Sequence, residues 1–185
     1  MLPLYLSFID SEQERIKFSQ IYEQYRYTML HTAMQILKDH DLAEDAVHNA
    51  CLKIIEHLPK FFELSRNKTK SLLVIISKNK AIDILRKEQG LALTPLENVE
   101  NSLNSDYEDP LEALISHDGY QRLVGSIAKL NDIYRTVLQL KYVHDYTNQE
   151  IAELLDISLN NVNIRLYRAK LFLKEILKED EGHDQ

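Results

Sequence analysis

Carboxylate and imidazole side chains gather in one short stretch, where their types and spacing could bind a metal ion. Glu44 and His48 are four positions apart, so they would share one face of a helix, with Asp41 and Asp45 nearby. A helical site of this kind draws matching ligands from other helices, yet no Glu-x-x-His pair, His-Glu-x-x-His motif or glycine-rich phosphate loop occurs elsewhere in the chain. A solvated acidic face explains the stretch more simply. We therefore expect no metal, no cofactor, no catalytic site and no small-molecule substrate.

Cationic side chains near the carboxyl end offer a different chemistry, which is contact with phosphate groups. From Asn160 to Lys174 the sequence contains Arg165, Arg168 and Lys170 and no acidic residue, although the whole chain carries a net charge of -7. Charge of one sign on one helix favours binding to a nucleic acid. The alternative is a plain helical hairpin whose basic face is only solvated.

A helix-turn-helix is the element that would position these cations. Thr147 and Glu150 form a Thr-x-x-Glu capping box, which predicts a short helix beginning near Asn148. Asp156 then falls in a tight turn, and Ser158 can cap a second helix. On that second helix Val162, Leu166, Ala169 and Leu173 would face inward, whereas Asn161, Arg165, Arg168 and Lys170 would face outward. A helix of this kind suits the major groove of DNA.

A second basic segment lies in the first half of the chain. It has seven basic residues (Arg66, Lys68, Lys70, Lys78, Lys80, Arg86 and Lys87) against Asp83 and Glu88, a net charge of +5. We predict a helix from about Lys70 to Gln89, with Leu72, Ile75, Ile76, Ile82 and Leu85 on its inner face. Phe61 and Phe62 precede it in a polar loop, where they could stack on the bases of a single strand. A pair of core phenylalanines is the more common outcome.

Two further helices are predicted before this basic segment. Ser11 with Glu14 forms a capping box for a long helix that ends near Lys38 to His40, and Asp41 can cap the next helix, which Pro59 stops. Cys51 lies on the apolar face of that helix, which indicates a buried small residue rather than a nucleophile. Three helices can thus share one core.

Composition sets the fold class and the domain organisation. The 185 residues are 44% hydrophobic with four glycines and four prolines, and their apolar spacing favours an all-α fold. Seven acidic residues and no Lys or Arg lie between Glu97 and Asp118, which indicates a linker. We predict one helical domain over residues 1–92, a linker over 93–117, a second domain over 118–178 and an acidic tail over 179–185. No stretch is long enough for a membrane span and no signal peptide is evident, so we expect an intracellular protein without membrane insertion.

Four stretches, two in each predicted domain, carry a resemblance to a known family. They are DLAEDAVHNACLKI (residues 41–54), NKAIDILRK (79–87), LNDIYRTVLQLKYVHDYTNQEIAELLDIS (130–158) and NVNIRLYRAK (161–170). In this order they resemble the extracytoplasmic-function (ECF) sigma factors of bacterial RNA polymerase, and the resemblance covers most of the chain. It implies a region 2-like helical bundle of three or four helices, a region 4-like helix-turn-helix, and a cytoplasmic protein of a bacterium. Core RNA polymerase, promoter DNA and an anti-sigma factor are the partners it implies.

The resemblance also implies roles for individual residues. Glu44, Asp45 and His48 would face the clamp helices of the largest polymerase subunit. Six residues would lie along the minus-10 element, namely Lys78, Asn79, Lys80, Asp83, Arg86 and Lys87, with the loop from Phe61 to Lys70 holding a flipped base. Six others would read or clamp the minus-35 element, where Arg favours guanine and Asn favours adenine. They are Asn160, Asn161, Asn163, Arg165, Arg168 and Lys170.

Two positions depart from the family pattern within the helix-turn-helix. Asp156 stands where a turn glycine is common, and Asn163 stands where a Lys or Arg is frequent. Asp is tolerated in the left-handed conformation better than most residues, whereas the loss of a cation weakens phosphate binding. The alternative function is a stand-alone helix-turn-helix regulator whose first block is a dimerisation or sensing domain, and a third is an interaction module held by an inhibitor.

Overall fold

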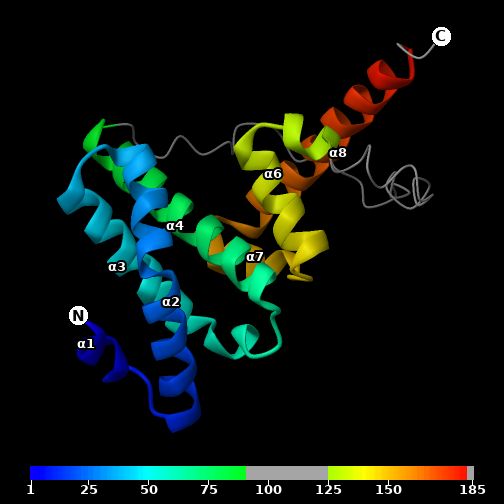
Figure 1. Ribbon diagram of the computed structural model, residues 1–185. Helices are drawn as coiled ribbons and strands as arrows, with labels where there is room; N and C mark the ends of the chain where they lie inside the picture. Colours follow the sequence, from blue (N-terminus) through cyan, green and yellow to red (C-terminus); the bar gives the residue numbers. More distant parts are fainter. Residues whose placement is uncertain (91–124, 183–185) are drawn as a thin grey trace. The chain divides into compact units, whose positions relative to one another are not determined.

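The chain forms two compact helical units. The computed structural model describes residues 1–90 and 125–182, and the chain divides into Met1–Thr94 (the N-terminal unit) and Pro95–Gln185 (the C-terminal unit). Every regular element in these described ranges is helical, as Figure 1 shows. The prediction of an all-α fold with two helical domains is therefore confirmed. The acidic stretch from Glu97 to Asp118 lies outside the described residues, so the linker and the domain boundaries stay predictions.

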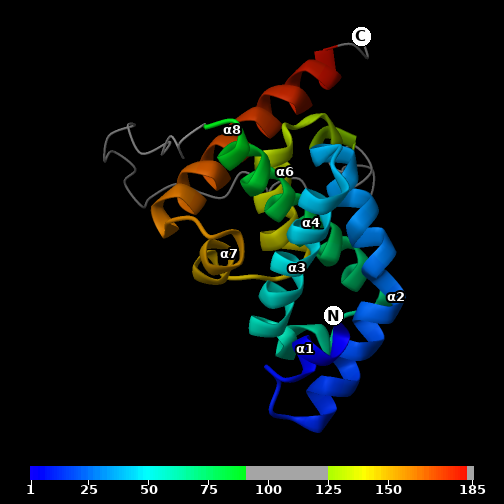
Figure 2. The same ribbon diagram turned by 90° about the vertical axis from the view of Figure 1, so that its left-hand side faces the viewer.

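The N-terminal unit is a bundle built on three long helices. It comprises α1 (Leu2–Leu6), α2 (Glu12–Leu37), α3 (His40–Glu56), the 3-10 turn η1 (Leu58–Phe61) and α4 (Arg66–Glu88). Helices α2, α3 and α4 each contact the other two, and Figure 2 shows them side by side from a second direction. Their shared core contains Phe18, Met29, Ala33, Ala43, Ala50, Ile54, Leu72, Ile76 and Ala81. The alanines keep side-chain volume low, which lets the helix backbones approach closely.

The caps of α2 and α3 differ from the sequence prediction. Ser11 is the residue before α2, but its side chain makes no capping hydrogen bond. Helix α3 is capped by Asp39 and not by Asp41, because the Asp39 carboxylate accepts a hydrogen bond from the Leu42 N–H at 3.0 Å. Only Lys38 and Asp39 separate the two helices, and Lys38 turns the chain with a φ of 58°. So short a connection moves the start of α3 ahead of Asp41.

Helix α4 begins earlier than predicted. It starts at Arg66 rather than near Lys70, because the Ser65 hydroxyl accepts a hydrogen bond from the Lys68 N–H. Thr69 and Ser77 occupy buried positions, whereas the predicted core residues Ile82 and Leu85 are half-buried. A buried hydroxyl is tolerated at Ser77 because it donates to the Leu73 carbonyl at 2.7 Å. Helix α4 thus buries six residues between Thr69 and Ser77, although Arg66, Asn67 and Lys70 are exposed, and in its second half only Ala81 is buried.

The C-terminal unit holds the helix-turn-helix. After a helical stretch over residues 125–129 come α6 (Asp132–Leu138), the π-helical turn η4 (Gln139–Val143), α7 (Asn148–Leu155) and α8 (Leu159–Gly182). Helix α8 packs against both α6 and α7. The predicted helix from Asp132 to Tyr142 is therefore present, but it changes to π-helical geometry over its last turn. No helix in the described ranges is long and apolar enough to cross a membrane.

Candidate nucleic-acid interface

The turn between α7 and α8 follows the local sequence signals closely. The capping box is complete, since the Glu150 N–H donates to the Thr147 hydroxyl at 3.2 Å and the Thr147 N–H donates to the Glu150 carboxylate at 2.8 Å. Asp156 ends α7 in the left-handed conformation with a φ of 53°. Ser158 caps α8 by accepting a hydrogen bond from the Asn161 N–H at 3.2 Å. All three local predictions are confirmed, and together they fix where α8 begins.

Helix α8 buries one face and leaves polar residues on the other. The predicted inward residues Val162, Leu166, Ala169 and Leu173 are buried, together with Ile164, which the sequence interpretation did not include. Of the six predicted minus-35 residues, Asn160 and Asn163 are exposed, whereas Asn161, Arg165, Arg168 and Lys170 are half-buried. Asn160 and Asn163 are therefore the predicted minus-35 residues that are most open to solvent.

Two of the predicted minus-35 residues are engaged by neighbours from other elements. The ammonium group of Lys170 lies 5.7 Å from the ring centroid of Tyr142 in η4, a cation–π contact. The carboxamide of Asn163 accepts a hydrogen bond at 2.7 Å from the side chain of Asn148, the first residue of α7. Sequence reasoning missed both contacts, because neither partner lies within one helical turn of the other.

The six predicted minus-10 residues share the outer face of the second half of α4. Ala81, Ile84 and Leu85 turn toward a cluster of Ala33, Leu37, Ala43 and Ala46 on α2 and α3. The remaining face carries Lys78, Asn79, Lys80, Asp83, Arg86 and Lys87, of which Lys87 is exposed and the others are half-buried. The structure thus brings these residues together on one surface with four cations and one carboxylate.

Phe61 and Phe62 have different environments. Phe61 is fully buried, so for this residue the core interpretation is correct. Phe62 is 46% exposed, and the Lys17 ammonium lies 5.8 Å from its ring centroid. An exposed aromatic ring beside a cation is the combination that stacks on a base while a phosphate is neutralised nearby. Whether Phe62 stacks on a base stays a prediction.

The acidic face of α3 is exposed but not isolated. Glu44 and Asp45 are exposed, and the Glu44 carboxylate lies 4.0 Å from the guanidinium of Arg26 on α2. His48 is half-buried, and its Nδ1 forms a hydrogen bond of 3.0 Å with the hydroxyl of Tyr5. A hollow of about 350 Å³ between α3 and α4 is lined by Leu42, Asp45, His48, Asn49, Ile84, Lys87 and Glu88. Residues predicted for two different partners, Asp45 and Lys87, therefore border one surface.

Two groups that could ionise, the Cys51 thiol and the Tyr5 hydroxyl, are buried in the N-terminal unit. Cys51 is fully buried on α3, and burial raises the pKa of its thiol to about 12. Burial also raises the pKa of the Tyr5 hydroxyl, which reaches from α1 into the same core. Both groups stay protonated at neutral pH. Within the described ranges, no group of three or more His, Cys, Asp or Glu side chains is arranged to hold a metal ion.

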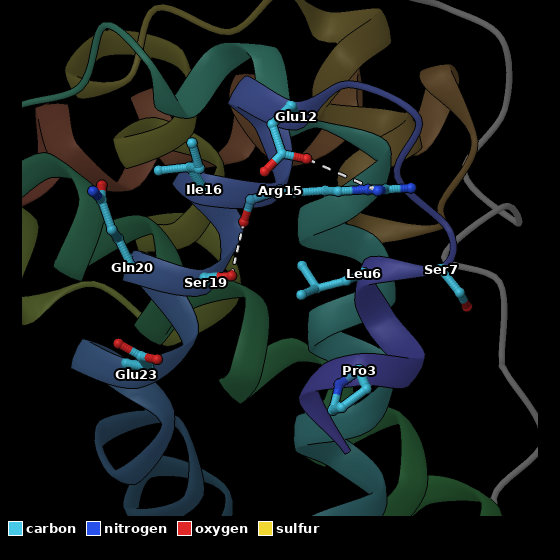
Figure 3. Close-up of a pocket in the computed structure, with 9 residues that line it drawn as sticks. All are labelled: Pro3, Leu6, Ser7, Glu12, Arg15, Ile16, Ser19, Gln20 and Glu23. Atoms are coloured by element: carbon cyan, nitrogen blue, oxygen red, sulfur yellow. Dashed lines mark hydrogen bonds and ion pairs between the residues drawn. The ribbon is translucent and has the colours of Figure 1, made fainter.

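A second hollow, of about 570 Å³, lies between α1 and the start of α2 and is shown in Figure 3. Glu12 and Arg15 form an ion pair of 3.9 Å on its wall, and the Arg15 side chain also donates to the Ile9 carbonyl at 2.7 Å. None of the predicted site residues lines it. The hollow forms where the chain turns between α1 and α2, and the sequence analysis did not predict this turn.

Comparison with known proteins assigns each unit. Residues 21–90 match the family model for sigma-70 region 2, and residues 120–173 match that for sigma-70 region 4. RNA polymerase sigma factor SigV of Bacillus subtilis is 30% identical over 151 residues, which cover 80% of this chain and 84% of SigV. The chain belongs to the ECF sigma factors. Two other relatives from the same organism agree with this assignment. ECF RNA polymerase sigma factor SigW is 27% identical, and the match covers 88% of this chain and 89% of SigW. RNA polymerase sigma factor YlaC is 25% identical, and the match covers 94% of this chain and 99% of YlaC.

The family assignment fixes the general function of this sigma factor. It is a transcription initiation factor that works with core RNA polymerase and promoter DNA. The region 2 match begins within α2 and ends after α4, and the region 4 match includes α6, η4, α7 and most of α8. A stand-alone helix-turn-helix regulator is not favoured, because residues 21–90 match sigma-70 region 2 and not a dimerisation or sensing domain. Helix α1 lies outside both matches.

Proposed function

We propose that this sigma factor uses three surfaces, one to bind core polymerase and two to recognise the promoter. The outer face of α3 binds the clamp helices of the largest polymerase subunit, the outer face of α4 binds the minus-10 element, and the start of α8 binds the minus-35 element. The observation that carries this proposal is that each predicted set includes exposed residues on its helix, namely Glu44 and Asp45 on α3, Lys87 on α4, and Asn160 and Asn163 on α8. The acidic stretch over residues 93–117 would be the tether between the two domains, and the place of action would be the bacterial cytoplasm.

The polymerase contact rests on the α3 carboxylates. Glu44 and Asp45 project from the same helix turn, and an exposed carboxylate can pair with a cation on a partner without first breaking a buried contact. The Glu44 carboxylate lies 4.0 Å from the guanidinium of Arg26, so part of its charge is already balanced within the protein. Asp45 is therefore the residue whose replacement should weaken polymerase binding most directly.

The minus-10 contact combines cations with one exposed ring. Lys78, Lys80, Arg86 and Lys87 would follow the phosphates of the non-template strand, and Phe62 with Lys17 would meet an unstacked base near the start of α4. Extruding a base costs a few kcal/mol, so a rigid surface formed before DNA binding lowers the total cost of opening. The buried residues Leu72, Ile75 and Ile76 anchor α4 in the core of the N-terminal unit and supply that rigidity.

At the minus-35 element, the start of α8 enters the major groove of the DNA. Arg165 and Arg168 are one turn apart on α8, so both can reach the same groove from one helix. Arginine side chains can bind guanine with two hydrogen bonds or clamp a phosphate. An anti-sigma factor would restrain this sigma factor by covering one or more of the three surfaces.

Separate measurements of polymerase affinity and of upstream-element dependence test this division. We expect Asp45→Ala to weaken core polymerase binding about tenfold, an effect on the order of one lost charge pair. We expect Arg165→Ala and Arg168→Ala to leave that affinity unchanged but to reduce the ratio of transcripts from promoters with intact and scrambled minus-35 elements. Asp41→Ala is the matched control, because Asp41 is an exposed acid on the same helix outside the proposed contact. Equal loss of polymerase affinity in the Asp45, Arg165 and Arg168 variants would contradict the division.

A further inference from the structure

We propose that Asn148 is a positioning residue that orients the side chain of Asn163, so that Asn163 presents its amino group, and not its carbonyl oxygen, to the minus-35 element. The inference rests on the proposed function of α8 and goes beyond it, because it names the chemical preference of one position in the DNA. Asn148 lies at the first position of α7, fifteen residues before Asn163 on α8.

The pair is held by one short hydrogen bond between the two helices. The Asn148 amino group donates to the Asn163 carbonyl oxygen at 2.7 Å. Asn148 is half-buried, whereas Asn163 is exposed. The exposed side chain of Asn163 is thus tied to the first residue of α7, where the capping box of Thr147 and Glu150 fixes the helix backbone.

Burial at Asn148 favours this orientation over the reverse. The Asn148 carbonyl oxygen is shielded from solvent and has no hydrogen-bond partner. Turning both carboxamides around would place an amino group, with two N–H donors, at that shielded position. A buried acceptor with no partner is less costly than an unpaired buried donor, and an amino group has two such donors. The orientation with the Asn163 amino group outward is therefore the more stable one.

The orientation changes what Asn163 recognises. A free asparagine favours adenine, because it accepts from the N6 amino group and donates to N7 at the same time. When the Asn163 carbonyl oxygen accepts from Asn148, the side chain offers mainly donors to DNA. Donors match guanine N7 and O6, adenine N7 and thymine O4, whereas the major-groove edge of cytosine offers only its N4 amino group. The pair should thus select against cytosine at the base that Asn163 meets.

The hydrogen bond from Asn148 can form only if residue 163 has an acceptor, which asparagine provides. A lysine or arginine here would bind phosphate or guanine as a cation, and it could not accept the hydrogen bond from Asn148. The asparagine keeps a donor without the charge. Specificity at this position then depends on two residues from different helices.

Transcription by polymerase holoenzyme from a promoter library with a randomised minus-35 element tests the inference. The DNA position that Asn163 meets is first identified as the one whose base preference is lost in Asn163→Ala. With the unaltered sigma factor, cytosine at that position should yield about fivefold fewer transcripts than the other bases, the effect of about one hydrogen bond. In Asn148→Asp, the introduced carboxylate can only accept, so Asn163 must turn its amino group inward and its carbonyl oxygen toward DNA. Cytosine and adenine, which carry donors, should then be preferred.

Asn148→Ala supplies the second variant, since it removes the restraint without adding a charge. The released Asn163 should favour adenine. The readout is the ratio of transcripts between bases at that position within each variant, because the added negative charge near phosphate lowers transcription from all sequences alike. The inference is overturned if the preference at the Asn163 position is the same in the unaltered protein, Asn148→Asp and Asn148→Ala. If no variant and not even the unaltered protein distinguishes minus-35 sequences, the proposed role of α8 is wrong and the inference falls with it.

Discussion

At the scale of single residues, the candidate binding side chains are held by partners distant in the sequence. His48 bonds to Tyr5, Glu44 lies beside Arg26, and Asn163 bonds to Asn148. Residue spacing predicted which side chains would share a face, because that follows from helical periodicity. It could not predict these partners, since contacts between helices depend on how the helices cross. The sequence thus identified candidate contact residues but not what orients them.

The Tyr5–His48 hydrogen bond should contribute to stability. Tyr5→Phe removes only the hydroxyl, and we expect a loss of about 1 kcal/mol in the free energy of unfolding, as for one partly buried hydrogen bond. Urea unfolding followed by circular dichroism measures it. Tyr27→Phe is the matched control, because Tyr27 is 74% exposed, and it should change the free energy by less than about 0.5 kcal/mol. Equal effects of the two substitutions would argue against the contact.

The Cys51 thiol should be inert in the folded protein. Its pKa is raised by burial from 9.0 to about 12, so the folded state holds the proton more tightly than the unfolded state does. This contribution to stability is therefore present below about pH 9 and is lost as the pH rises toward 12. We expect no iodoacetamide labelling of the native protein at neutral pH and complete labelling in urea. Rapid labelling without urea would contradict the buried, protonated thiol.

At the scale of elements, the local signals of the helix-turn-helix predicted its caps correctly, whereas the predicted caps of α2 and α3 and the predicted start of α4 were wrong. The capping box at Thr147, the turn at Asp156 and the cap at Ser158 each depend on residues within four positions. The predicted cap of α3 was wrong because the sequence has two aspartates close together, Asp39 and Asp41. The position at which α2 ends determines which of them caps α3. Capping chemistry alone could not make that choice.

Replacement of the two aspartates distinguishes the caps. Asp39→Ala should lower the free energy of unfolding by about 1 kcal/mol, because it leaves an N–H of the first turn of α3 without its acceptor. Asp41→Ala should cost less, since Asp41 contributes only its charge near the helix start. The midpoint of urea unfolding measures both. A larger loss in Asp41→Ala would restore the cap predicted from the sequence.

At the scale of the whole molecule, the charge distribution explains why this sigma factor should need polymerase to bind DNA. The chain has a net charge of -7, and its cations are concentrated on α4 and on α8. Duplex binding depends on neutralising phosphates, and a net negative protein with few such contacts should hold DNA weakly by itself. Docking through α3 would supply the missing affinity. The acidic stretch from Glu97 to Asp118, with seven acidic residues and no Lys or Arg, lies outside both family matches.

Run-off transcription tests the central claim most directly. Bacterial core polymerase is combined with genomic fragments that include the region upstream of this gene, with and without the purified chain, and DNA binding by the chain alone is measured in parallel. We predict discrete promoter-dependent transcripts only when polymerase and the chain are both present, and weak duplex binding by the chain alone. Tight promoter binding without polymerase, together with no promoter-dependent transcript, would contradict the account.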